Sequence, residues 1–238
     1  MLIKHFSALS IALNTVRKET QAHGFSWEKE LISKVYGATQ EELKSIKYTS
    51  KIDLPAELNK LDKCDLSIKT SCNLNTVCMA DCLRIYDELS SGKPFHLVTV
   101  FYKQNDELMT KNIIKICEVN LTGSAALLFG GITRKEIEGL AATVKAVPQK
   151  RKPTEEEYTA MYALRDALQP RMGALHLDIK CNSQQSRLQC SFNGFQKFME
   201  DNPNSVVATS NCGEFRGGKI KESVVSSRRK FKKDSVEN

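Results

Sequence analysis

The segment over residues 63–71, KCDLSIKTS, constrains the fold most, because its alternation of side chains is typical of a β-strand. Alternate side chains of a strand share a face, so Asp65, Ser67 and Lys69 lie on one face and two aliphatic residues on the other. An acidic residue and a lysine thereby lie in one short row, and the opposite face of the strand is apolar. This arrangement suits a group that binds a metal ion next to a group that handles a phosphate.

Length and charge limit the possible domain organisation and binding partners. The chain has 238 residues, enough for one large domain or two small ones, and we expect a single domain over residues 1–215. A basic C-terminal tail over residues 216–238 is expected to follow, because residues 216–233 contain eight Lys or Arg and a single acid. The net charge of +7 permits a nucleic-acid partner without requiring one.

Eight cysteines are present and none forms a CxxC pair. With no secretion signal, we expect reduced thiols in a cytoplasmic or nuclear protein, and no apolar run is long enough to span a membrane. A structural zinc site at Cys72, Cys78 and Cys82 is a weak alternative, since Cys78 and Cys82 share a face if they lie on a helix.

Periodicity and turn residues predict alternating helices and strands. Helices are expected over residues 6–22, 27–36, 75–89, 134–146, 154–168 and 194–200, and strands over residues 64–71, 95–102, 111–120, 175–181, 186–192 and 206–208. This order predicts a mixed α/β fold, with one central mixed β-sheet flanked by helices.

The order of helix, acid-containing strand ending in lysine, helix and strand is similar to the core of the PD-(D/E)xK restriction-endonuclease-like superfamily. The residues that carry the resemblance are Glu28, Asp65, Lys69 and the following Thr70 and Ser71. The resemblance implies that acids bind Mg²⁺, that the lysine positions or activates the attacking water, and that DNA is cleaved, usually by a dimer. It assigns Asp65, Ser67 and Lys69 to catalysis, and Glu28 and Asp65 to the metal.

This sequence departs from the family pattern at Ser67, where the family has Asp or Glu two residues before the lysine. The first acid of the family usually lies ten or more residues upstream. Asp53 has about that separation from Lys69 but sits in a proline-containing segment, and Asp62 is nearer. The metal ligands therefore stay open at this point.

A second row, His176, Asp178 and Lys180, also has the D-x-K spacing on one strand face. It competes for the catalytic role, but we expect Asp178 and Lys180 to line the DNA cleft instead. The strand is followed by a hairpin rich in Asn, Gln, Ser and Arg. Such side chains read base edges in the major groove, and the hairpin contributes Gln185, Arg187 and Gln189 to the predicted DNA contacts. A polar surface hairpin is the alternative.

Three further arginines complete the predicted DNA-binding set. Arg84 is expected on the helix after the catalytic strand, facing the DNA backbone or pairing with Asp81. Arg228 and Arg229 belong to the basic tail, where they would add salt-dependent phosphate contacts, as would the run over residues 150–152.

The sequence thus predicts a Mg²⁺-dependent, site-specific endonuclease of double-stranded DNA, similar to a type II restriction enzyme. A homodimer is expected, with no membrane partner and no small-molecule cofactor. The first alternative is a non-catalytic DNA-binding protein on a decayed nuclease fold, which Ser67 would fit. The second is an α/β interaction protein whose basic tail merely keeps it in solution.

Overall fold

A computed structural model describes residues 26–44 and 52–225 of the chain. The helices are residues 26–34, α2 (Gln40–Lys44), α3 (Cys82–Ser90), α4 (Ala125–Phe129), α5 (Arg134–Ala146), α6 (Glu155–Leu168) and α7 (Phe195–Asp201). The strands are β1 (Asp65–Ser71), β2 (Val77–Asp81), β3 (Phe95–Asn105), β4 (Thr110–Asn120), β5 (Leu175–Asn182), β6 (Gln185–Phe192), β7 (Val206–Ser210), β8 (Glu214–Phe215), β9 (Gly218–Lys219) and β10 (Ser223–Val225).

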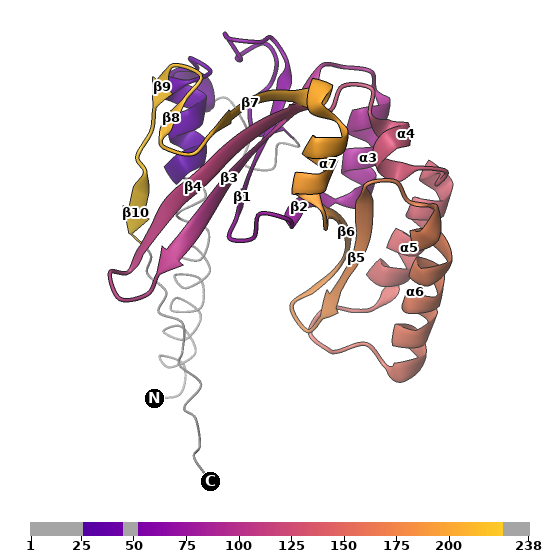
Figure 1. Cartoon of the computed structure of the whole chain (residues 1–238). Helices are drawn as coiled ribbons and strands as arrows, with labels where there is room; N and C mark the ends of the chain where they lie inside the picture. The colour runs from indigo at the N-terminus through magenta and orange to yellow at the C-terminus, as the bar shows by residue number, and fades with distance from the viewer. Residues whose placement is uncertain (1–25, 45–51, 226–238) are drawn as a thin grey trace.

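The main sheet has the order β1-β3-β4-β10, with β7 also paired to β4 (Figure 1). β1 and β3 are parallel, whereas β3 and β4 are antiparallel, as are the pairs of β4 with β7 and β10. Parallel neighbours need a crossover connection, and here it contains α3. The predicted mixed α/β fold with a mixed sheet is confirmed.

Two hydrophobic cores lie on opposite faces of β3, whose residues 95–101 are all buried. Leu97 and Phe101 pack in one core together with residues of β2, β6 and α5. Val98 and Val100 pack in the other, against the helix over residues 26–34. Burial on both faces explains why this strand is a continuous apolar run rather than an alternating one.

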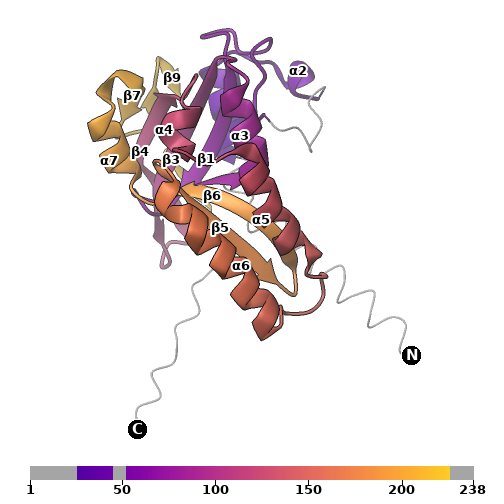
Figure 2. The same ribbon diagram turned by 90° about the vertical axis from the view of Figure 1, so that its right-hand side faces the viewer.

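A second sheet, of order β2-β6-β5, lies beside the first. Figure 2 shows α5 and α6 along one face of this sheet, and α5 contacts β6 while α6 contacts β5. We expected one sheet; the described residues form two larger sheets and the small pair β8–β9. The second sheet forms because β2, predicted as part of a helix, pairs with the predicted hairpin.

The expected helix over residues 75–89 is wrong in its first half. Val77 and Met79 alternate inward as strand residues, and a bulge at Cys78–Ala80 interrupts the pairing with β6. Ala80 has a left-handed backbone (φ 84°), which ends the regular strand. The helix then begins after Asp81, whose carboxylate accepts a hydrogen bond from the Arg84 backbone N–H at 3.0 Å.

Two other helix starts agree with the sequence. Thr133 and Thr154 each cap a helix in a reciprocal capping box, with Glu136 and Glu157 as the respective partners. The expected helix over residues 6–22 lies outside the described residues.

The predicted boundary at residue 216 is wrong, because residues 216–225 belong to the folded domain. β9 pairs with β8, and β10 extends the main sheet beside β4. The Trp27 indole N–H donates to the Lys221 carbonyl at 2.9 Å, which ties this segment to the helix over residues 26–34. No helix of the described chain is long and apolar enough to cross a membrane.

The cap of α3 is testable by substitution. Asp81→Ala removes the acceptor for the Arg84 N–H and is expected to lower the free energy of unfolding by about 1 kcal/mol. Asp81→Asn keeps an acceptor oxygen, and its free energy of unfolding is expected to fall by less. Urea denaturation of the three proteins measures the difference; equal losses for both variants would show that the carboxylate acts elsewhere than in the cap.

Candidate active site

Asp53 is held against the free edge of β1. The backbone N–H groups of Asp53 and Leu54 donate to the Leu66 carbonyl at 3.0 and 3.2 Å, and Leu66 N–H donates back to the Leu54 carbonyl at 2.8 Å. Pro55 follows at once, and a residue before proline favours the extended conformation that this bridge requires. The bridge places the Asp53 side chain beside the second half of β1.

Three donors of the predicted catalytic strand contact one oxygen of the Asp53 carboxylate. Its Oδ2 atom accepts hydrogen bonds from the Ile68 backbone N–H at 2.6 Å, the Ser67 hydroxyl at 3.2 Å and the Lys69 ammonium at 3.1 Å. The Lys69 and Asp53 side chains are 19% and 25% exposed, so water reaches the pair. The structure thus brings together Asp53, Ser67 and Lys69.

Glu28 joins this group from the helix over residues 26–34. Burial raises the pKa of the Glu28 carboxyl from its ordinary value of 4.5 to about 7, and the negative charge of Asp53 adds to the increase. The positive charge of Lys69 lowers the pKa of Glu28 and so partly offsets this increase. Both residues are therefore within electrostatic reach of Glu28.

Asp65 lies on the predicted strand face, but its carboxylate is hydrogen-bonded away from Lys69. It shares a strand face with Lys69, but four residues separate them, which is about 13 Å along a strand. Its Oδ1 atom accepts a hydrogen bond from the Ala56 backbone N–H at 2.7 Å. The carboxylate that pairs with Lys69 is therefore that of Asp53 and not that of Asp65. The signal was the separation of 16 residues between Asp53 and Lys69.

The second D-x-K row is engaged in contacts within the second sheet. Asp178 accepts a hydrogen bond from the Ser191 hydroxyl at 2.6 Å and lies 3.4 Å from the His176 ring. Gln189 is buried and accepts from the Cys78 thiol at 3.8 Å. The predicted DNA contacts by Asp178 and Gln189 would therefore require these bonds to break.

The outer end of the same hairpin is exposed and basic. Lys180 and Arg187 are both exposed and are direct cross-strand partners. Like charges opposite each other destabilise a strand pair. Lys150 lies nearby, because its backbone N–H donates to the Ser183 carbonyl in the hairpin turn at 3.0 Å. Half-buried Gln185 starts the second strand of the hairpin.

The remaining predicted residues are not gathered at this site. Arg84 lies in the first turn of α3, and its Nε atom is buried without a hydrogen-bond partner. Arg228 and Arg229 lie outside the described residues. Cys72 and Cys78 are exposed while Cys82 is buried, and these three thiols do not form a metal-sized group in the part of the chain that the structure describes.

Comparison with protein-family models, curated proteins and solved structures found no match. The chemistry of the site consequently depends on its own geometry.

The raised pKa of Glu28 predicts how stability depends on pH. The folded state keeps the proton up to about pH 7, whereas the unfolded state loses it near pH 4.5. The unfolded state thus binds fewer protons in this window, and the free energy of unfolding of the metal-free protein should fall as pH rises from about 4.5 to about 7. Thermal denaturation across this range is the measurement.

Glu28→Gln should remove this part of the decline, because glutamine does not titrate. Glu107→Gln, the same substitution at an exposed turn residue, should leave the decline in place. A Glu28→Gln protein with the full decline would show that Glu28 titrates normally.

Proposed function

We propose that the protein is a Mg²⁺-dependent endonuclease that hydrolyses phosphodiester bonds of double-stranded DNA in the manner of a type II restriction enzyme. The observation that supports this proposal is the Asp53–Lys69 ion pair at 3.1 Å, with the Glu28 carboxyl within electrostatic reach of both residues. Two carboxylates beside a lysine form a donor set that serves a metal ion and a phosphate together.

The donor set fits Mg²⁺. This ion prefers oxygen ligands and is commonly bound by one or two carboxylates together with phosphate oxygens. Glu28 and Asp53 would hold it, and the Ser67 hydroxyl is the nearest further oxygen on β1. When bound, Mg²⁺ polarises the phosphate and makes water a better nucleophile.

The protein residues orient the reacting groups. The Ile68 backbone N–H fixes the Asp53 carboxylate, since a main-chain donor in a paired strand cannot rotate away. The Lys69 ammonium lies at the same carboxylate and is the positive charge available to the scissile phosphate. Its pairing with Asp53 keeps the ammonium in position before DNA binds.

The exposed end of the β5–β6 hairpin supports a polyanionic partner. The Lys180–Arg187 pair is unfavourable for the isolated protein, and phosphate groups between the two cations would relieve the repulsion. Ser67 and Lys69 point to the face of the main sheet that carries Leu97 and Phe101, and the second sheet packs on that face. The hairpin and the Lys69 side chain thus belong to the same side of the main sheet, whereas the helix that carries Glu28 covers the other side.

The rival function is DNA binding without cleavage. It is favoured by Ser67, which replaces an acidic residue with a hydroxyl and leaves two carboxylates at the site. The cleavage experiment below separates the two functions.

Cleavage is tested with a mixed-sequence plasmid in Mg²⁺ and in EDTA. We expect discrete fragments in Mg²⁺ alone, and Asp53→Asn and Lys69→Ala should each reduce the cleavage rate about 100-fold or more. Asp65→Asn is the matched control, because asparagine retains an oxygen to accept the Ala56 N–H. It should cleave at close to the unmodified rate.

The assignment would be reversed if Asp65→Asn abolished cleavage and Asp53→Asn did not. DNA that is shifted in a gel but uncut in Mg²⁺, over plasmids that present every short sequence unmodified, would establish the rival function.

The hairpin is tested separately by DNA affinity. Arg187→Gln is expected to weaken binding and to lower the slope of log K against log salt by about 1, because one phosphate contact is lost. It should not lower the free energy of unfolding, since the repulsion with Lys180 is removed. Lys197→Gln removes an exposed lysine paired with Asp201 on α7 and should leave the salt slope unchanged. Equal slopes for all three proteins would remove the hairpin from the DNA interface.

A further inference from the structure

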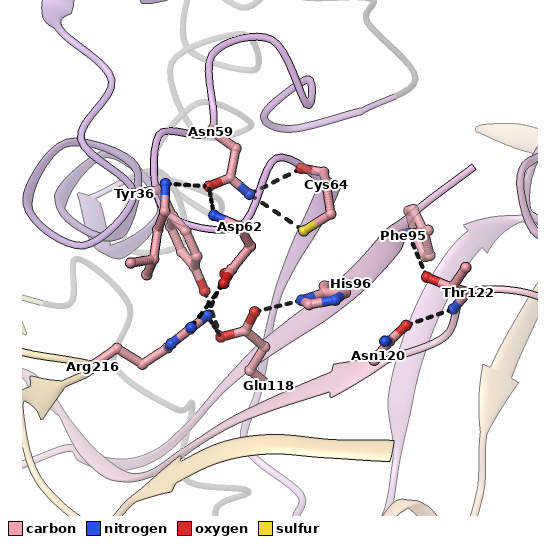
Figure 3. A network of polar contacts seen from close by, with 11 residues as sticks. Tyr36, Asn59, Asp62, Cys64, Phe95, His96, Glu118, Asn120, Thr122 and Arg216 are labelled. Atoms are coloured by element: carbon pink, nitrogen blue, oxygen red, sulfur yellow. Dashed lines mark hydrogen bonds and ion pairs between the residues drawn. The ribbon is translucent and has the colours of Figure 1, made fainter. Parts of the chain in front are cut away.

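A cluster of mixed ligand types lies on the other face of the main sheet (Figure 3). Asp62, Cys64 and His96 each offer one ligand atom, and these three atoms lie within 4.8 Å of one another. Cys64 and His96 are 1% and 9% exposed. His96 lies on the face of β3 opposite to Thr99, the register partner of Lys69, so this cluster is separate from the proposed nuclease site.

Neighbouring side chains contact two of the three ligands and orient them. His96 Nδ1 lies 2.7 Å from the Glu118 carboxylate, and a metal ion bound at Nε2 would leave this contact in place. A carboxylate behind a histidine ring is the arrangement that orients metal-ligating histidines and fixes their tautomer. The Cys64 sulfur accepts a hydrogen bond from the Asn59 side chain at 3.3 Å, which sets the direction of the thiol.

Two carboxylates share one guanidinium at this cluster. Asp62 and the fully buried Glu118 both bind one guanidinium, that of Arg216, at 2.9 Å from Asp62 Oδ1 and 2.8 Å from Glu118 Oε2. Two negative charges thus face one positive charge. If Cys64 binds as a thiolate, three negative charges are present, and Arg216 together with a divalent ion supplies three positive charges. Buried charges need such compensation.

The donor types select the ion. Sulfur, imidazole nitrogen and carboxylate oxygen are the ligands of Zn²⁺, whereas Mg²⁺ and Ca²⁺ take oxygen ligands. We propose that Asp62, Cys64 and His96 bind a Zn²⁺ ion, with water in the fourth position and with Glu118 and Arg216 orienting the ligands. Binding releases the Cys64 thiol proton to water. The ion joins the loop before β1 to β3, and through Arg216 to the turn between β8 and β9.

Cobalt absorption tests this site in the full-length protein. Co²⁺ replaces Zn²⁺ at such sites, and a cobalt–thiolate bond produces an intense charge-transfer absorption in the near ultraviolet. We expect one equivalent of Co²⁺ to produce this band and Zn²⁺, but not Mg²⁺, to remove it. Cys64→Ser should abolish the band. Cys212→Ser, at an exposed cysteine that contacts Ser210, is the matched control and should retain it.

The spectrum of the unmodified protein decides the test even if Cys64→Ser fails to fold. Absence of a thiolate band would overturn the proposal, as would a band unchanged in Cys64→Ser. Asp53→Asn should leave the band intact while it stops DNA cleavage, so failure of the zinc site and failure of the nuclease site give different results.

Discussion

The burial of β3 on both faces is the constraint on which the rest of the structure depends. Residues 95–101 are enclosed, so each face of the main sheet must be covered by its own layer. The helix over residues 26–34 covers one face and the second sheet covers the other. His96 consequently lies on the side that the helix over residues 26–34 covers, and Lys69 points to the other side.

The edge of β1 explains how a carboxylate reaches the lysine. One bridge between Leu54 and Leu66 positions Asp53, and three donors on β1 then fix its carboxylate. The carboxylate is therefore part of the sheet's hydrogen bonding as well as part of the site. This double role ties the geometry of the site to the pairing of two backbone segments.

Local sequence signals predict most helices and strands, but the site depends on contacts between segments that are distant in the sequence. Capping residues such as Thr133 and Thr154 mark helix starts because their hydrogen bonds span three residues. Lys69 and Glu28 were found from pattern and resemblance. The sequence leaves the metal ligands open, because Asp53 sits in a proline-containing segment whose strand is a single bridge, too short to show alternation. Residues 77–81 form a strand instead of the predicted helix, and no glycine marks the left-handed backbone at Ala80 in the sequence.

The C-terminal segment joins residues that are far apart along the chain. Trp27 bonds to Lys221 across 194 positions, and Arg216 bonds to Asp62 across 154. Closing loops of this length costs entropy before any contact compensates for it, and proteins dominated by such contacts fold slowly. The central strands can pair before these closures form, so folding is expected to finish with the docking of residues 214–225. Until then, the buried Glu118 carboxylate lacks its guanidinium partner and is held by His96 and the Tyr36 hydroxyl.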